Sequence, residues 1–315
     1  MYKIGVKCIL ESDLILTSTT ATEGFFKSLD YIPGAKFMGL AAKSLYKMDV
    51  ANQEKTLDLF HRGKVFYGDA HPIIDGKPSF RVPFDWHKDK KEEGYKDIYL
   101  YHLIDRDTRV SLEEGVQLKQ LREGYVTEDC HFFKISQNFS LKSPFNNRKS
   151  RAQHVSGESF EESQLFGYYS LPGQTEWYFT LESENKAYLA DVLDILVNAS
   201  ARMGRSSSAE YGAARFEPFD AFDSFDPSRQ ASSQANAPIE TPIYAFSNLC
   251  FYDDLGNPTG MPSPKDLNLP ENAKILWNKS RIRTRRYASY NKKRNARNAD
   301  RLIIEKGSVI MISHE

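Results

Sequence analysis

The sequence lacks any run of eighteen apolar residues, and its first residues become acidic and hydroxyl-rich too early for a secretory signal. We therefore expect a soluble, cytoplasmic protein without a membrane partner. Cysteine is scarce: Cys8, Cys130 and Cys250 lie far apart and form no CxxC pair. This spacing argues against a disulfide framework and a cysteine zinc site, so we expect core-facing thiols, no metal and no cofactor.

Common enzyme motifs are also missing. The chain contains no HExxH, no Walker loop, no GxSxG and no GxGxxG after a strand, which leaves protease, NTPase and dehydrogenase functions without support. Apolar residues, by contrast, make up 40% of the 315 residues, and aromatic residues make up 13%. That content is enough for a sizeable core, so a wholly disordered chain is not expected.

Positive charge is concentrated at one end of a chain whose formal net charge is zero. Residues 279–315 hold eleven Lys and Arg against three Asp and Glu, so residues 1–278 hold 31 against 39. This division predicts a polyanionic partner for the basic end.

The basic stretch interleaves its cations with two tyrosines. Cations bind phosphates and tyrosine rings stack on unpaired bases, so the pattern is typical of a single-stranded RNA site. A solvated loop, or a patch that binds an acidic protein, is the alternative. The predicted RNA-binding residues of this stretch are Arg281, Arg283, Arg285, Arg286, Tyr287, Tyr290, Lys292, Lys293 and Arg294.

Apolar periodicity predicts an α+β fold. Strands are expected at 2–10, 97–104, 131–142, 176–183 and 213–219, and helices at 35–48, 52–60, near 112–121, and from 187 to the Gly-Ser stretch at 204–212. A β-rich run at 63–74 is expected to be interrupted at Pro72. Over residues 1–217 the order is strand, helix, inserted elements, strand, strand, helix, strand. Two helices on one face of an antiparallel sheet in this order give a ferredoxin-like (RRM-type) fold.

The order of these elements and the local composition also predict the domain organisation. Residues 1–219 are expected to form the ferredoxin-like domain, with an insertion at about 50–130. An acidic and then Ser/Gln/Ala-rich linker covers 220–242. Residues 243–315 are expected to form a C-terminal β extension, in which strands at 243–253 and 307–313 flank the basic loop.

Five stretches resemble, in their order and spacing, the RAMP superfamily of CRISPR-associated proteins. They are YIPGAKFMGLAAKSLY at 31–46, GKVFYGDAHPI at 63–73, ESQLFGYYSLPGQTEWYFTLE at 162–182, GRSSSAEYG at 204–212, and RRYASYN followed by EKGSVIMI near the C-terminal end. IPG turns and Gly-Ser loops are common, so the specificity lies in the combination. The resemblance is greatest to the subunit of type III effector complexes, III-D especially, that binds the 5′ end of crRNA.

This resemblance implies a non-catalytic, RNA-binding RAMP subunit in antiviral defence. Such a subunit grips the 5′ handle of crRNA and caps the backbone filament. The implied partners are crRNA, a backbone RAMP subunit and a large subunit, with target nucleic acid contacted indirectly.

The Gly-Ser stretch gives that implication a physical basis. Two glycines bring backbone N–H groups and hydroxyls close to phosphates without Cβ obstruction, although a helix C-cap at Gly204 with a flexible connector is the alternative. The acidic Glu210 departs from the family pattern. The predicted RNA-binding residues here are Arg202, Gly204, Arg205, Ser206, Ser207 and Gly212.

Two further groups of cations are candidates. Lys36 and Lys43 follow the Pro33–Gly34 turn, where a helix would present its first N–H groups to an anion, although packing of Gly34 and Gly39 is an equal alternative. Arg148, Lys149 and Arg151, with Lys142 and His154, occupy a polar stretch between two strands. A solvated loop is the equal alternative there.

A ribonuclease is the main alternative function. In the family that the chain resembles, target RNA is cleaved by an acidic residue shortly before the IPG turn, and Asp30 has that place here. Precursor crRNA would instead need a histidine as general base, and His61, His71 and His154 are the candidates. Each of these residues has a commoner structural explanation. A third hypothesis is a protein-binding role for the acidic residues 1–278.

Overall fold

The computed structural model describes residues 1–17, 25–91, 94–95, 97–104, 115–142, 166–198, 200–208, 210–219, 239–270, 272–288, 290–291 and 296–314. The chain divides into two compact units. Unit 1 comprises residues 1–78 and 135–225, and unit 2 comprises residues 79–134 and 226–315. In the described part, three α-helices in unit 1 accompany mostly antiparallel sheets, so the protein belongs to the α+β class. None of the described helices is long and apolar enough to cross a membrane.

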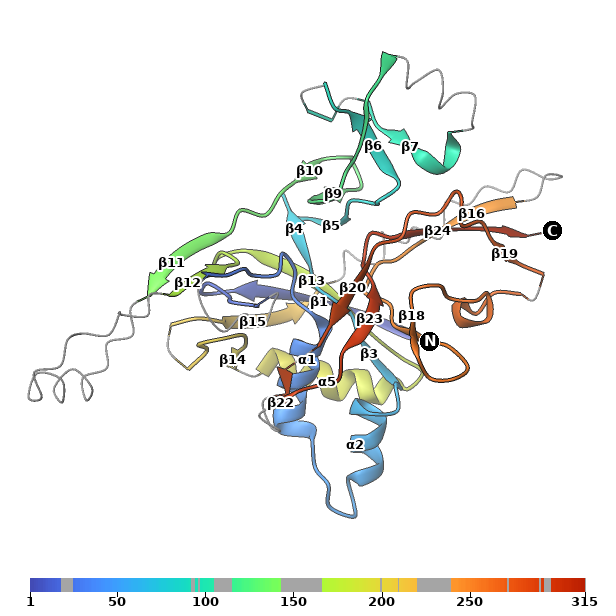
Figure 1. Ribbon diagram of the computed structural model, residues 1–315. Coiled ribbons are helices and arrows are strands. Elements are labelled where there is room, and N and C mark those ends of the chain that lie inside the picture. The colour runs from blue at the N-terminus through green and yellow to red at the C-terminus, as the bar shows by residue number, and fades with distance from the viewer. Residues whose placement is uncertain are drawn as a thin grey trace, which may run out of the picture. The chain divides into compact units, whose positions relative to one another are not determined.

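Unit 1 contains one main sheet, the three helices and a smaller group of strands (Figure 1). Its helices are α1 (Gly34–Leu45), α2 (Gln53–Phe60) and α5 (Lys186–Asn198). Its strands are β1 (Tyr2–Leu10), β2 (Phe25–Phe26), β3 (Val65–Tyr67), β4 (His71–Ile74), β11 (Asn138–Lys142), β12 (Phe166–Ser170), β13 (Glu176–Ser183), β14 (Ala201–Arg202) and β15 (Ala213–Pro218).

Strand β1 lies inside the main sheet, between β13 and β15. The strand order is β4-β13-β1-β15-β14, with β3 also paired to β13, and every pair is antiparallel. In the smaller group, β12 pairs antiparallel with β11 and parallel with β2. The strands predicted at 2–10, 176–183 and 213–219 and the helices predicted at 35–48 and from 187 are present, with α2 as an inserted element. Strands β2, β12 and β14 were not predicted, and β11, within the strand predicted at 131–142, belongs to the smaller group and not to the main sheet.

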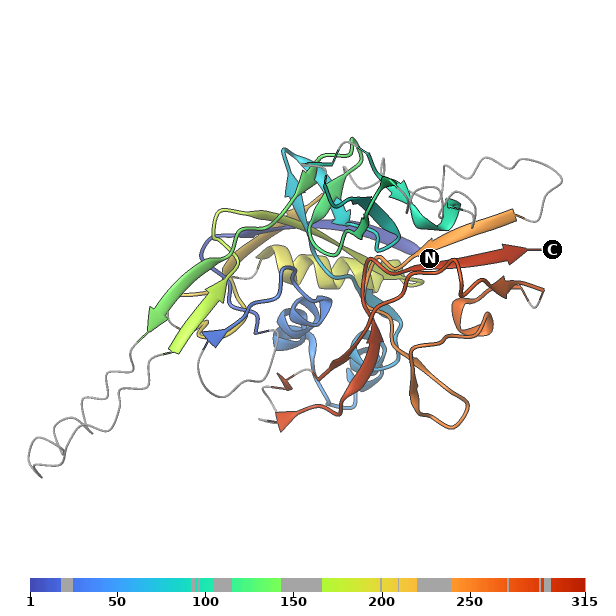
Figure 2. The same cartoon turned by 45° about the horizontal axis from the view of Figure 1, so that its top comes forward.

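The core of unit 1 lies between the main sheet and the helices, and Figure 2 shows α1 and α5 on the same face. The alternation predicted for residues 2–10 places Val6 and Cys8 in this core, both fully buried. Phe37 of α1 stacks on Phe179 of β13, with ring centroids 3.7 Å apart and planes 7° apart. Leu189, Val192 and Leu196 form the buried stripe of α5, as their helical spacing predicts.

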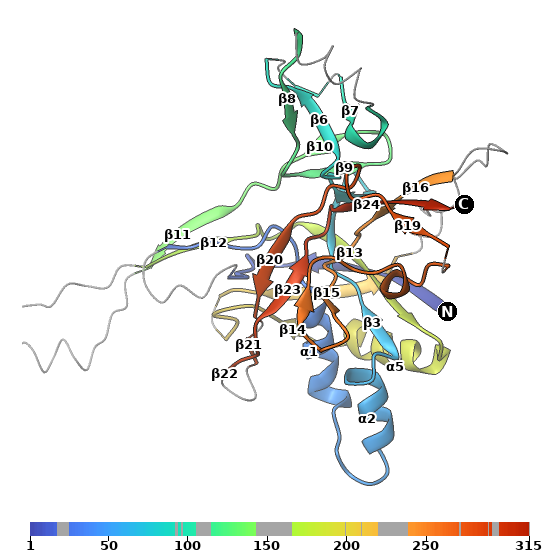
Figure 3. The same ribbon diagram turned by 45° about the vertical axis from the view of Figure 1, so that its right-hand side comes forward.

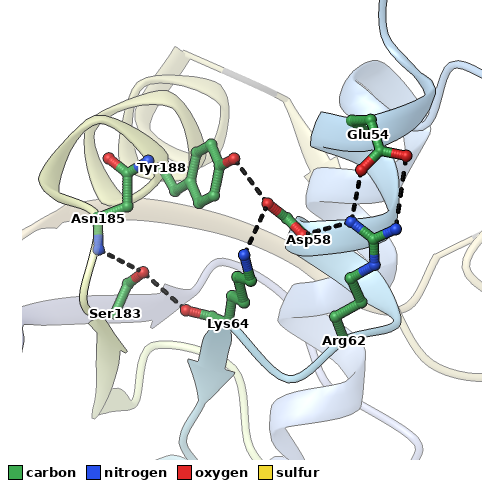
Figure 4. A network of polar contacts seen from close by, with 7 residues as sticks. All are labelled: Glu54, Asp58, Arg62, Lys64, Ser183, Asn185 and Tyr188. Atoms are coloured by element: carbon green, nitrogen blue, oxygen red, sulfur yellow. Dashed lines mark hydrogen bonds and ion pairs between the residues drawn. The ribbon is translucent and has the colours of Figure 1, made fainter.

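A polar network joins α2 to α5 (Figure 4). The Asp58 carboxylate accepts hydrogen bonds from Arg62 (3.0 Å) and from the Tyr188 hydroxyl (2.9 Å), and Lys64 lies 3.4 Å away. Arg62 also binds Glu54 at 2.6 Å. The hydrogen bond from Arg62 is the largest influence that lowers the pKa of Asp58. The network therefore fixes the inserted helix α2 against α5 through an ionised carboxylate.

Unit 2 consists of short strands in several small sheets. Its strands are β6 (Trp86–Asp89), β7 (Tyr99–Leu100), β8 (Leu118–Gln120), β9 (Tyr125–Thr127), β10 (Phe132–Phe133), β16 (Ile239–Tyr244), β17 (Phe251–Tyr252), β18 (Pro258–Thr259), β19 (Lys274–Ile275), β20 (Thr284–Tyr287), β21 (Tyr290–Asn291), β22 (Ala296–Arg297), β23 (Arg301–Ile304) and β24 (Val309–His314). It also has two single-turn 3₁₀ helices, Tyr101–Leu103 and Lys265–Leu267. Strand β5 (Lys77–Arg81) begins in unit 1 and ends in unit 2.

The longest ladder of unit 2 joins β16 and β24. Strand β24 agrees with the strand expected at 307–313, whereas β16 begins at Ile239, inside the segment expected to be a linker, and shares only residues 243 and 244 with the strand expected at 243–253. Strand β24 also pairs with β19, so it has a neighbour on each side. Strands β20 and β23 form a separate antiparallel pair, seen in Figure 3.

Several sequence-based expectations were wrong or incomplete. Pro72 does not interrupt the run at 63–74 but lies within β4, opposite Trp177. Proline has no backbone N–H, so it is tolerated in a strand at a position where the ladder does not need that donor. The expected helix near 112–121 contains strand β8 in its described part. Residues 131–142 form two strands, and 97–104 form a short strand followed by a 3₁₀ turn. Local periodicity over three or four residues cannot separate these cases.

Gly34 holds the first turn of α1 against the segment that follows β3. A Cβ at Gly34 would lie 2.0 Å from the Tyr67 carbonyl oxygen and 2.8 Å from that of Gly68. The packing alternative considered for Gly34 therefore has a definite physical cause. At Gly39, on the same helix, a Cβ would meet nothing within 4 Å.

These two glycines give a matched pair of substitutions. We predict that Gly34→Ala lowers the free energy of unfolding by about 3 kcal/mol, because backbone must move to admit the methyl group. Gly39→Ala should instead raise it by up to about 1 kcal/mol, because alanine favours helix and the space is open. Urea denaturation of both variants checks this, and equal effects would contradict the close approach at Gly34.

Candidate nucleic-acid interface

The Gly-Ser stretch forms a loop that lies directly on the chain segment after β1. At Gly204, where φ is +82°, a Cβ would lie 2.5 Å from the Ile15 carbonyl oxygen. At Gly212, where φ is +77°, it would lie 1.8 Å from the Met203 carbonyl oxygen. Both positions need glycine because of the backbone conformation and the contact.

The alternative of a helix C-cap at Gly204 is wrong, because α5 ends at Asn198 and strand β14 comes between them. Backbone N–H groups of the loop that could have bound a phosphate are instead hydrogen-bonded within the protein. The Gly212 N–H donates to the Asp13 carbonyl (2.8 Å) and the Arg205 N–H donates to the Ile15 carbonyl (3.0 Å). These two N–H groups therefore serve the fold, and the loop offers side chains to a ligand instead.

Three of the predicted cations come together around this loop. The Lys43 ammonium, from the last turn of α1, lies 3.4 Å from the Arg202 carbonyl oxygen. The Arg202 guanidinium lies 3.4 Å from the Ser207 carbonyl oxygen. Lys43, Arg202 and Arg205 are exposed, while Ser206 and Ser207 are half-buried. Residues 159 positions apart in the chain thus form one cluster, which we call the loop cluster: Lys43, Arg202, Arg205, Ser206 and Ser207.

Arg205 is held by an aromatic pair that sequence reasoning missed. Its guanidinium lies over the ring of Tyr168, 5.3 Å from the centroid. Tyr168 is buried beside Tyr211 and Ile15, with the two tyrosine rings edge to face at 6.4 Å. The available signal was the Tyr pair within residues 162–182 and the Tyr that precedes Gly212. A cation fixed on a ring loses less conformational freedom when it binds a phosphate.

Asp13 joins the loop to the neighbouring strands. Its carboxylate accepts hydrogen bonds from the Gly173 N–H (2.9 Å), the Ser170 hydroxyl (2.8 Å) and the Asn138 amide (3.0 Å). Burial by itself would raise the pKa of Asp13, but these hydrogen bonds outweigh it and hold the pKa below its ordinary value. No pattern in the sequence indicated this role for Asp13.

The first N–H group of α1 is bound by a carboxylate of the protein itself. The Asp69 carboxylate accepts a hydrogen bond from the Gly34 N–H at 3.0 Å. Lys36 is half-buried on this helix, and burial lowers the pKa of its ammonium. Asp30 is half-buried just before the turn. The anion expected at this helix end is thus supplied by the protein itself.

The face of the main sheet opposite the helices carries paired charges. Lys7 of β1 lies 3.5 Å from Glu176 of β13 and 3.2 Å from Glu217 of β15. Lys3 lies 3.3 Å from Glu182. Since each cation faces a carboxylate, this face offers phosphates little net attraction.

The basic segment of unit 2 is in part a strand and not the loop expected from its composition. Arg285 of β20 lies 2.9 Å from Glu305, and Arg283 lies 3.9 Å from the same carboxylate. The Arg281 guanidinium lies 3.2 Å from the ring centroid of Tyr101. These three arginines make contacts that stabilise unit 2, whatever else they bind.

Other predicted residues of this segment differ in their placement. Arg286 is exposed and Tyr287 is half-buried, on opposite faces of β20. Tyr290 lies in β21. Six predicted residues lie outside the described residues: Arg148, Lys149, Arg151, Lys292, Lys293 and Arg294.

His61 and His102 each contact a polar side chain. In unit 1, the His61 imidazole lies 3.1 Å from the Tyr46 hydroxyl. In unit 2, His102 contacts the buried Asp85 carboxylate through Nδ1. His71 is fully buried in β4, and His154 lies outside the described residues. Within the described ranges, no group of three or more His, Cys, Asp and Glu side chains could hold a metal ion.

Comparisons with known proteins find a likeness of fold. No family model matches the sequence, and no curated protein matches it. A chain of the type III-B Cmr-β complex bound to cognate target RNA and AMPPnP, seen by cryo-electron microscopy, superposes with a TM-score of 0.53 at 11% identity. The alignment covers 98% of this chain and 86% of that one. A second structure of Cmr-β bound to cognate target RNA gives a TM-score of 0.52 with the same identity and coverage.

The Asp13 carboxylate makes the integrity of this site depend on pH. Because its pKa is lowered in the folded state, its contribution to stability is present above the unfolded pKa of about 3.9 and is lost as the pH falls below that value. We predict that Asp13→Asn costs about 1 to 2 kcal/mol of unfolding free energy at pH 7 and less at pH 3. Denaturant unfolding at both pH values measures the difference, and a cost that does not change with pH would contradict an ionised Asp13.

Proposed function

We propose that this chain is an RNA-binding subunit of a type III CRISPR effector complex. The observation that carries the proposal is the loop cluster, in which Lys43, Arg202 and Arg205 meet around a glycine-restrained loop. The likeness of fold to a chain of an RNA-bound type III-B complex supports it. Unit 1, with its strand order β15-β1-β13-β4 and two helices on one face, is best interpreted as a ferredoxin-like RAMP domain.

The loop cluster fits the backbone of a single RNA strand. Lys43 presents a point charge, whereas Arg205 is held on Tyr168 and presents a flat guanidinium. The serine hydroxyls at 206 and 207 add donors for phosphate or 2′-hydroxyl oxygens. Because the open sheet face is charge-paired, we place RNA at the loop and not across the sheet as in an RRM.

The finer role that we propose comes from the sequence resemblance. The chain grips the 5′ handle of crRNA, caps the backbone filament and contacts a backbone RAMP subunit and a large subunit. The arginines of β20 and its neighbours form a second RNA contact in this proposal, with Arg286 as its most accessible described member. Their structural contacts make Arg286 the better residue to test, because its substitution leaves the Glu305 ion pairs intact.

Charge reversal in the loop cluster tests the proposal. We predict that Lys43→Glu combined with Arg205→Glu weakens binding of crRNA by at least tenfold at 150 mM salt. The slope of log affinity against log salt should fall by about 1.4, which corresponds to two lost phosphate contacts on a single strand. Fluorescence anisotropy with labelled crRNA over a salt series measures both quantities.

The matched control is Lys186→Glu, which reverses an exposed charge on α5 of the same unit. It should leave affinity within twofold of the wild-type value. Unchanged binding in the double variant, or an equal loss in the control, would contradict RNA binding at the loop cluster.

A ribonuclease remains the second candidate function, and the His61–Tyr46 pair is the observation that favours it. An imidazole hydrogen-bonded to a tyrosine is a plausible general base for attack by a ribose 2′-hydroxyl. Target cleavage through Asp30 is the other form of this hypothesis.

The binding role predicts that labelled target and precursor RNA both stay intact with the purified complex. Denaturing gels of parallel reactions with Asp30→Ala, His61→Ala and Tyr46→Phe identify the responsible group if cleavage occurs. Cleavage that is abolished by one of these substitutions would replace the non-catalytic proposal.

A further inference from the structure

The hairpin of β17 and β18 in unit 2 ends in an ordered turn that exposes a leucine. Phe251 pairs with Thr259 and Tyr252 pairs with Pro258, which leaves a turn from Asp253 to Asn257. Leu255, inside this turn, is 88% exposed. Tyr252 on the strand and Met261 just beyond it are 48% and 66% exposed.

Asp253 fixes the turn that carries Leu255. Its carboxylate accepts hydrogen bonds from the Leu255 N–H (3.0 Å) and the Asn257 N–H (2.7 Å), and from the Asn257 amide (3.2 Å). The Asp253 carbonyl accepts from the Gly256 N–H at 2.9 Å. Hydrogen bonds from Asn257 lower the pKa of Asp253, so the carboxylate stays charged at neutral pH. The leucine backbone is thus ordered before any partner binds.

The base of the hairpin is anchored as well. A Cβ at Gly260 would lie 2.8 Å from the Thr284 side chain and 3.6 Å from the Leu302 side chain, so the chain passes close to β20 and β23. The packed base of the hairpin and the hydrogen-bonded turn together hold the Leu255 side chain exposed to solvent. Pre-ordering of this kind removes part of the entropy cost of binding.

The charge of the hairpin indicates the class of its partner. Residues 249–264 contain two aspartates, Asp253 and Asp254, and no Lys or Arg. Aspartate repels phosphate, and an exposed leucine cannot stack on a base, so RNA does not fit the turn from Asp253 to Asn257. A protein pocket that is apolar in the centre and rimmed by Lys or Arg matches both the leucine and the aspartates.

We propose that the tip around Leu255 docks into such a basic-rimmed apolar pocket on another protein subunit. This inference rests on the proposed function only in that the chain belongs to a multi-subunit complex. Leu255 is the anchor, Asp254 contributes charge at the rim, and Asp253 acts as a positioning residue that keeps the turn closed.

Assembly with the other subunits of the complex tests the docking surface. The full chain and its variants are co-expressed with those subunits, and association is measured by affinity capture and by titration of purified components. Leu255→Asp should weaken association by at least tenfold, and Asp254→Lys should weaken it by severalfold. Asp253→Ala keeps the leucine but loosens the turn, so it should weaken association by less than Leu255→Asp.

The matched control is Val50→Asp, because Val50 is 97% exposed in unit 1. It should assemble as the wild type does, and every variant should bind crRNA with wild-type affinity. Normal assembly of Leu255→Asp, or an equal loss with Val50→Asp, would overturn the docking surface. A wild-type chain that binds crRNA but associates with no other subunit would also overturn it, while leaving the proposed RNA binding in place.

Discussion

Direct contact between two backbone segments organises the candidate RNA site: the loop after β14 lies on residues 12–15. The contact requires glycine at 204, since a Cβ there would lie 2.5 Å from the Ile15 carbonyl oxygen, and the loop itself requires glycine at 212, where a Cβ would lie 1.8 Å from the Met203 carbonyl oxygen. Hydrogen bonds from Arg205 and Gly212 to the carbonyls of Ile15 and Asp13 close it. Once the loop is fixed there, Arg202 comes beside Lys43 and Arg205 comes over Tyr168. The charge cluster is therefore a consequence of backbone packing and not of attraction among like charges, which would repel.

The two units differ in how they use positive charge. In unit 1, three exposed cations gather around the loop while the open sheet face pairs its lysines with glutamates. In unit 2, the arginines at 281, 283 and 285 contact an aromatic ring or Glu305. A high local count of Arg thus does not by itself define an RNA surface, because part of the charge is used to stabilise a unit made of short strands.

Sequence patterns predicted the long elements of unit 1 well and the short ones of unit 2 poorly. The alternation in Tyr2–Leu10 and the helical spacing of Leu189, Val192 and Leu196 extend over enough residues to define a period. Strand β8 has three residues, and its identity is decided by pairing with β6, which no local pattern reports. Lys43, Arg202 and Arg205 were predicted as RNA-binding residues from charge and from family resemblance. That they lie around one loop was not predicted. Asp13 and Tyr168 were missed because their roles depend on partners up to 160 positions away.

Site-resolved crosslinking of crRNA to the assembled complex, with peptides identified by mass spectrometry, is the most direct measurement of where RNA lies on this chain. The account predicts crosslinks in the loop at 202–212 and at Lys43, and none on the sheet face that carries Lys3 and Lys7. Crosslinks concentrated on that sheet face, with the loop unmodified, would contradict the central claim.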